Sequence, residues 1–137
     1  MILVDTGPLI ALFDPADAWH ARCVEVRKGV DEPLYTTTPV LKEAFHLLPS
    51  ASVGARRLME FITQGGLGLW FLDDRGLERA FELMVRYSDL RMDFADASLV
   101  TAAERLRVQK VFTIDRRDFR TYRARRGHRS VPFELIN

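Results

Sequence analysis

Residues 1–14, MILVDTGPLIALFD, contain the clearest indication of the fold class. The opening run MILV is short, apolar and partly β-branched, and it stops at Asp5 and the turn-prone TGP that follows. Such a run is typical of a buried strand. The next residues, PLIALFD, begin with a proline, which favours the first turn of a helix. A strand, an acidic turn and a helix in this order predict the first step of a parallel sheet.

The same alternation continues along the chain. Further strand-like runs are PLYTT (33–37), LGLWFL (67–72), KVFTID (110–115) and VPFELI (131–136). Helix-like segments are DAWHARCVEVRKG (17–29), PVLKEAFHLL (39–48), SVGARRLMEFITQGG (52–66), DDRGLERAFELMVRYSD (73–89) and DFADASLVTAAERLRV (93–108). Strands alternating with helices predict a three-layer α/β/α sandwich with a central parallel sheet. With no repeat or linker, residues 1–137 are expected to form a single domain.

Composition narrows the class of protein. The single cysteine, Cys23, excludes an intramolecular disulfide and a thiolate metal cage. We find neither a basic leader nor an apolar run of the roughly 20 residues that a membrane span needs. We therefore expect a cytoplasmic protein that makes no contact with a membrane. The formal net charge is only +1, but basic and acidic residues are unevenly distributed.

Several acids fall where a ligand site is expected. Ligands of open α/β sheets bind outside the carboxyl ends of the strands, and Asp5 and Asp115 each follow a strand-like run. Asp93 and Asp96, in RMDFADASLV, head the helix that leads to the strand 110–115, so a right-handed crossover places them near the same edge. Glu43 lies among apolar residues of a helix, where a charge without a partner is costly. We expect these five acids to share one edge of the sheet.

Clustered carboxylates repel one another, which favours a bound cation. An all-oxygen ligand set without cysteine or a compact histidine pair suits Mg²⁺ or Mn²⁺ better than zinc. Such ions activate water and stabilise the charge that develops on a phosphodiester. The pattern therefore predicts phosphodiester hydrolysis.

Four segments together resemble the PIN-domain family, specifically its VapC-like toxin ribonucleases. They are ILVDTGPLIALFDPADAWHARC, TTTPVLKEAFHLL, DLRMDFADASLVTAAERL and VFTIDRRDF, and they span nearly the whole chain in the order of the family. The resemblance implies the three-layer α/β/α fold and an Mg²⁺-dependent endoribonuclease acting on single-stranded RNA. It also implies a cognate VapB-like antitoxin and a homodimer.

The resemblance also implies roles for individual acids. Asp5 and Asp96 match the principal metal ligands, while Glu43 and Asp115 complete the catalytic pocket, with Asp115 also a ligand. Asp93 is either a further metal ligand or only a helix cap. Each acid has a structural alternative, as an Asx turn, a first-turn helix acid or an ion-pair partner. The interval from Asp96 to Asp115 is slightly longer than is usual in the family.

Neighbouring hydroxyls and the basic run after Asp115 complete the set of candidates. We interpret Thr6 as a turn residue and leave the role of Thr113 open. Arg116 and Arg117, at the head of the run 116–129, are predicted to hold RNA phosphates. The rival interpretation is that these arginines dock an acidic segment of a protein inhibitor. None of the three histidines is assigned to chemistry.

Two other functions remain compatible with the sequence. One is a housekeeping RNA-processing nuclease, which would share the pocket and differ in its substrates. The other is a non-catalytic PIN-like module that binds RNA or protein. The presence of the whole set of acids argues against the second.

Overall fold

The computed structural model describes all residues from 1 to 137, and its centre is a sheet of five parallel strands in the order β3-β2-β1-β4-β7. The strands of this sheet are β1 (Ile2–Val4), β2 (Leu34–Thr37), β3 (Gly68–Trp70), β4 (Lys110–Phe112) and β7 (Glu134–Ile136). The helices are α1 (Thr6–Phe13), α2 (His20–Lys28), α3 (Thr38–Leu47), α4 (Val53–Thr63), α5 (Asp74–Arg86), the short 3-10 helix η1 (Ser88–Leu90), α6 (Phe94–Leu106) and α7 (Arg116–Thr121). A separate antiparallel hairpin joins β5 (Arg123–Arg126) to β6 (Arg129–Pro132).

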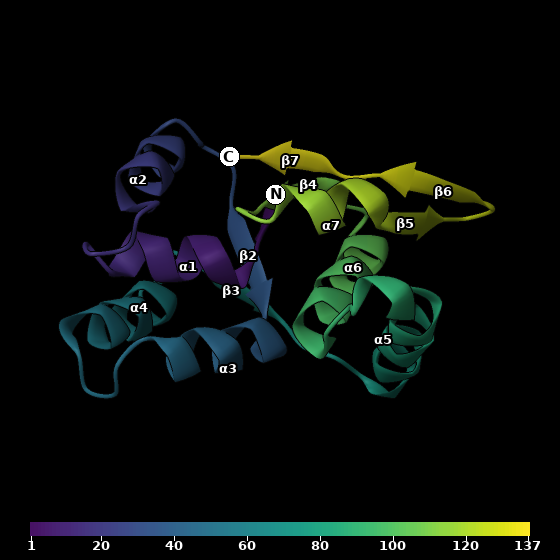
Figure 1. Cartoon of the computed structure of the whole chain (residues 1–137), viewed down its shortest axis with the longest axis horizontal. Coiled ribbons are helices and arrows are strands. Elements are labelled where there is room, and N and C mark those ends of the chain that lie inside the picture. Colours follow the sequence, from purple (N-terminus) through teal and green to yellow (C-terminus); the bar gives the residue numbers. More distant parts are fainter.

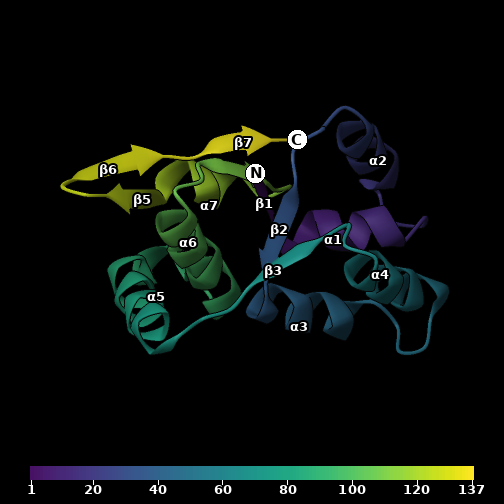
Figure 2. The ribbon, with the colours of Figure 1, turned by 180° about the vertical axis from the view of Figure 1, so that it is seen from behind.

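The helices cover the sheet on both sides. In Figure 1 the strands run between a group formed by α1 to α4 and a second group that contains α5 and α6. Figure 2 shows the same division from behind, with the hairpin projecting beyond α6. The predicted three-layer α/β/α sandwich with a parallel sheet is confirmed.

The central strand explains why the first residues indicate the fold class. Leu3 of β1 pairs with Tyr35 of β2 on one side and with Val111 of β4 on the other. All three residues of β1 are buried, as expected for a strand that is covered on both faces. The middle of helix α6, from Ala97 to Ala103, is buried in the core. Its first turn lies near the carboxyl edge of β1, because Asp96 is close enough to Asp5 for their charges to interact.

The C-terminal fifth of the chain differs from the sequence prediction. The strand predicted to run to Asp115 ends at Phe112, and Asp115 instead caps α7. The predicted last strand, 131–136, is divided: its first two residues belong to β6 of the hairpin and Glu134–Ile136 to β7 of the main sheet. Helix α7 and the hairpin were not predicted. No helix in the structure has the length and apolar character needed to cross a membrane.

Candidate active site at the carboxyl edge of the sheet

Asp5 lies at the end of the central strand and is almost completely buried. Its Oδ1 accepts a hydrogen bond from the backbone N–H of Thr6 at 2.8 Å, so the side chain caps α1. Its Oδ2 accepts a hydrogen bond from the hydroxyl of Thr113, also at 2.8 Å. Burial raises the pKa of Asp5 to about 6 despite these two hydrogen bonds, and repulsion by Asp93 and Glu43 adds to the rise. The carboxyl group of Asp5 therefore lies at the predicted carboxyl edge of the sheet, where burial and neighbouring acids disfavour its ionised form.

Asp96 occupies the first turn of α6 and is half-buried. Its Oδ2 accepts a hydrogen bond from the hydroxyl of Tyr122 at 3.0 Å. Burial is the main reason that its pKa is raised to about 8, and repulsion by Asp5 and Asp93 contributes further. Burial and Asp96 also raise the pKa of Tyr122, which keeps the phenol protonated as the donor. Asp5 and Asp96 are therefore electrostatic neighbours, as predicted.

Asp93 acts as the N-cap of α6. Its Oδ1 accepts a hydrogen bond from the backbone N–H of Asp96 at 2.8 Å. The side chain is exposed, and its charge contributes to the raised pKa values of both Asp5 and Asp96. The capping role is therefore present in the structure, and the carboxylate also belongs to the acidic cluster.

Glu43 reaches the same edge from α3. Its Oε2 accepts a hydrogen bond from the hydroxyl of Thr6 at 3.2 Å. Glu43 and Asp93 also line one open hollow between α3 and the start of α6. The charge within an apolar helix is thus explained by a polar site that it faces.

Asp115 stands further out, at the rim. It is exposed and caps α7, with Oδ1 accepting from the backbone N–H of Asp118 at 3.4 Å. The Thr113 hydroxyl that donates to Asp5 also accepts a hydrogen bond from the backbone N–H of Asp115 at 3.0 Å. Asp115 is therefore tied to Asp5 through Thr113, and no direct contact joins the two carboxylates.

Three further residues contribute to the site. Thr113, whose role the sequence left open, positions Asp5, and Tyr122 positions Asp96. Asp118 lies in the same hollow as Asp115, and burial together with Asp115 raises its pKa. Its spacing from Asp115 repeats that of Asp96 from Asp93, a signal that could have identified it. Nothing in the sequence marks Tyr122, because its approach depends on the fold of α7.

The basic residues next to Asp115 separate in space. Arg117 lines the hollow that contains Asp115 and Asp118. Arg116 instead donates a hydrogen bond to the side chain of Asn137 and lines a different cavity. Only Arg117 of the predicted pair therefore faces the acids.

The donors of this edge fit a hard divalent cation by their chemistry, since they are carboxylate and hydroxyl oxygens with no cysteine or histidine among them. No three potential ligands form a ready-made metal group in the structure. The metal-ligand roles of Asp5, Asp96, Asp115 and Asp93 remain predictions.

The sequence is similar to a known family and to a known ribonuclease. The family model described as PIN domain matches residues 2–124. Ribonuclease VapC26 of Mycobacterium tuberculosis is 30% identical over 131 residues, which cover 93% of this chain and 96% of that protein.

Solved structures show a similar fold. The crystal structure of VapC20 from Mycobacterium tuberculosis, described as a sarcin-ricin loop cleaving toxin, has a TM-score of 0.74 at 21% identity, covering 81% of this chain and 87% of that one. A toxin-antitoxin complex from Klebsiella pneumoniae has a TM-score of 0.64 at 18% identity, covering 88% of this chain and 92% of that one. At these identities the structural likeness concerns the fold.

Proposed function

The chain belongs to the PIN-domain family, and we propose that it is a metal-dependent endoribonuclease of the VapC type that cleaves single-stranded RNA. The observation that carries the proposal is the convergence of Asp5, Asp96, Asp93 and Glu43 at the carboxyl edge of the sheet. The relative that is 30% identical over most of both chains is a ribonuclease, which supports the same reaction.

Asp5 and Asp96 are proposed to hold the cation, with Asp115 and Asp93 as further ligands. A bound Mg²⁺ or Mn²⁺ ion supplies a Lewis acid that lowers the pKa of water and offsets charge on the phosphate. Thr113 and Tyr122 fix one oxygen of Asp5 and of Asp96, so both carboxylates are oriented before a cation arrives.

Glu43 completes the pocket as a carboxylate outside the principal pair. Its hydrogen bond to Thr6 holds it on the α3 side of the cluster. We assign it the orientation of the attacking water or the acceptance of its proton. Arg117 and Arg116 are proposed to bind RNA phosphates beside Asp115. The position of Arg117 among the acids supports this role more strongly than that of Arg116, which lines a different cavity.

The partners follow from the family. We propose a VapB-like antitoxin, since solved structures of similar fold include a toxin-antitoxin complex. We also propose a homodimer, for which α5 offers a surface: Phe81 and Val85 are 53% and 77% exposed, and Phe81 packs on Phe94. Exposed apolar patches of this kind commonly mark protein interfaces.

Cleavage of RNA tests the proposed function. Purified protein is expected to cleave a pool of single-stranded RNA in Mg²⁺ or Mn²⁺ and to stop in EDTA. Asp5→Asn and Asp96→Asn should each slow single-turnover cleavage at least about 100-fold, about 2.7 kcal/mol of lost transition-state stabilisation.

Asp31→Asn is the matched control, because Asp31 is exposed and forms no side-chain hydrogen bond or ion pair. It should cleave as fast as wild type. Undiminished cleavage by either pocket variant would remove that residue from the mechanism. A folded wild-type protein that cleaves no RNA would contradict the proposal and favour a non-catalytic binding module.

A further inference from the structure

The hairpin β5–β6 is strongly basic. Residues 119–133 contain five arginines and no acid, although the net charge of the whole chain is only +1. Gly127, with φ of 61°, and His128 form its two-residue turn. The match to the family ends at residue 124, so the tip of the hairpin lies beyond it. The family fold therefore does not account for this charge.

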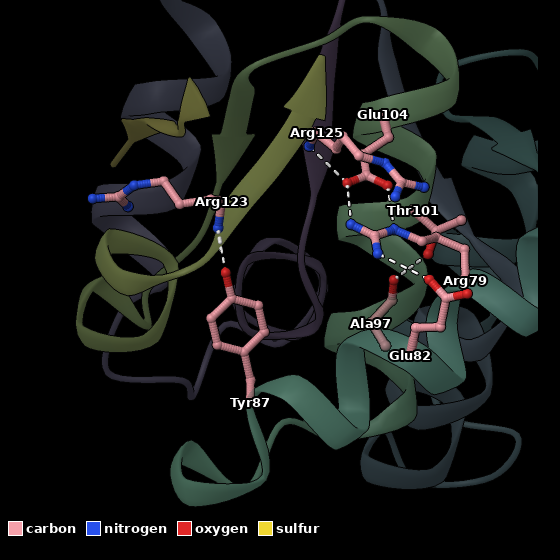
Figure 3. Close-up of polar contacts among 8 residues, drawn as sticks. All are labelled: Arg79, Glu82, Tyr87, Ala97, Thr101, Glu104, Arg123 and Arg125. Carbon is pink, nitrogen blue, oxygen red and sulfur yellow. Dashed lines mark hydrogen bonds and ion pairs between the residues drawn. The ribbon is translucent and has the colours of Figure 1, made fainter. Parts of the chain in front are cut away.

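The hairpin is fixed to the body of the protein along β5. The two backbone N–H groups that point away from β6 are satisfied by side chains: that of Arg123 donates to Tyr87 Oη at 3.1 Å and that of Arg125 to Glu104 Oε2 at 2.7 Å. Figure 3 shows both contacts, with Arg79 holding Glu104 through two hydrogen bonds of 2.8 and 3.0 Å. The free edge of β5 therefore has its hydrogen-bond donors satisfied, and these contacts fix the hairpin to α6 and to Tyr87.

The tip of the hairpin carries two arginines, Arg126 and Arg129, that form no ion pair within the protein, whereas Arg125 faces a hollow that contains Glu78, Glu82 and Glu104. Arg126 lies directly opposite Arg129 across the two strands, and like charges in this position destabilise a hairpin. No hydrogen bond or ion pair involves the side chains of Arg125, Arg126 or Arg129, whereas Arg123 is occupied with carbonyls at the end of α7. Two like charges in this position lower the stability of the hairpin, and no contact within the protein compensates for them. This indicates an anionic partner.

The hairpin begins beside the acidic pocket and leads away from it. Tyr122, immediately before β5, touches Asp96, and Arg125 is held by Glu104 at the other end of α6. Eight residues of helix separate these two contacts, about 12 Å, or about four stacked nucleotides. The tip is thus placed where an RNA strand that leaves the pocket along α6 would arrive.

We propose that Arg126 and Arg129, which lie opposite each other across the hairpin, form a second phosphate-binding site, which holds the substrate RNA about four or more nucleotides from the bond that is cleaved. This inference rests on the proposed ribonuclease function. It favours RNA over a protein partner because the tip, residues 125–130, contains no apolar residue to anchor a protein interface. Nucleic-acid interfaces, in contrast, are strongly basic and polar.

The test compares RNAs of different length. Binding of a trinucleotide and of a 20-nucleotide single strand is measured by fluorescence anisotropy in EDTA, so that no cleavage occurs. The variant combines Arg126→Gln with Arg129→Gln. Its affinity for the long RNA should fall roughly tenfold, and the slope of log K against log salt should flatten by about 1.4, or about 0.7 for each lost contact. Affinity for the trinucleotide should not change.

Two controls accompany this variant. Arg56→Gln with Arg57→Gln removes the same charge from exposed residues of α4, on the opposite side of the molecule from the hairpin, and should bind both RNAs as wild type does. Arg126→Lys with Arg129→Lys keeps the charge and should retain most of the affinity. Thermal melting of the Gln variant should occur at or above the wild-type temperature, since the like-charge pair is removed.

The outcomes separate the two proposals. Wild type that neither binds nor cleaves RNA would contradict the ribonuclease function itself. Wild type that cleaves RNA, with a Gln variant that binds the long strand unchanged, would overturn the second site alone. An equal loss for the trinucleotide and the long strand would also overturn it, because the arginines would then act at the pocket. Unchanged RNA binding with weakened binding of a co-expressed antitoxin would assign the tip to a protein partner instead.

Discussion

Asp93 and Asp96 lie three residues apart in RMDFADASLV, yet they have different environments. Asp93 is exposed, and one of its oxygens accepts the hydrogen bond that caps α6, where a carboxylate complements the helix dipole. Asp96 is half-buried, does not cap the helix, and faces Asp5 across the carboxyl edge of the sheet. Burial, together with repulsion by Asp5 and Asp93, therefore raises the pKa of Asp96.

This difference predicts the pH dependence of stability without metal. The pKa of Asp96 is about 8 in the folded protein and that of Asp5 about 6, against 3.8 for an unperturbed aspartate. Between about pH 4 and pH 8 the folded state binds more protons than the unfolded state, so the free energy of unfolding falls as pH rises. In EDTA, wild type should melt at a lower temperature at pH 8 than at pH 6.

Asp96→Asn removes the larger of the two shifts, so its melting temperature should decline less over the same interval. Asp31→Asn serves as the control and should decline as wild type does. The assignment of Asp96 to the cluster is wrong if calorimetric melts of wild type and Asp96→Asn show the same dependence on pH.

Glu43 could be identified as a charge among the apolar residues of a helix, and the positions of the aspartates could be predicted because each follows a strand-like run or stands at the head of a helix. The partners of the acids could not. Tyr122 reaches Asp96 only because α7 turns the chain back, and Thr113 reaches Asp5 because β1 and β4 are neighbours. Sequence patterns report which edge a residue occupies, whereas hydrogen bonds depend on contacts between segments far apart in the chain.

Among the secondary-structure elements, the ion pair between Arg79 and Glu104 joins α5 to α6, and Glu104 also accepts a hydrogen bond from β5. The two side chains are only 13% and 9% exposed. Removing one partner of a buried pair leaves the other charge uncompensated. Arg79→Leu should therefore reduce the free energy of unfolding by about 3 kcal/mol, as measured by urea denaturation.

The double variant, Arg79→Leu with Glu104→Leu, should recover most of this loss, because no charge is then left buried. Glu25→Leu breaks the exposed pair with Arg22 and should change stability by less than about 1 kcal/mol. A loss for Arg79→Leu no greater than that for Glu25→Leu would show that the pair does not fasten the two helices.

The elements that the sequence predicted are those with apolar periodicity. The strands β1 to β4 and the helices α1 to α6 bury apolar faces, and the pattern of those faces is visible in the sequence. Helix α7 and the hairpin were not predicted because arginines occupy half of the positions in α7, β5 and β6, and few residues, such as Phe119 and Ala124, are buried there. The split of VPFELI also depends on tertiary pairing, since β6 joins β5 and β7 joins β4.

In the molecule as a whole, the net charge of +1 is the sum of an acidic region and a basic region that lie apart from each other. The acidic cluster lies at the start of α6, and the basic tip is reached from the end of the same helix. An RNA strand would meet the arginines at the tip and the carboxylates of the cluster at the bond that is cleaved. A cation is needed at that point, because phosphate and carboxylate repel each other.

The carboxylates are proposed to form a cation site, and thermal melting across a Mn²⁺ series at pH 8 tests whether they do. In EDTA, Asp96→Asn should melt at or above the wild-type temperature, because repulsion is relieved. With Mn²⁺ at about 100 times its dissociation constant, wild type should gain about 2.7 kcal/mol, while Asp96→Asn gains little. Asp93→Asn should show a smaller effect of the metal. If Asp96→Asn is instead destabilised equally in EDTA and in Mn²⁺, Asp96 serves only its helix and the cation site does not exist.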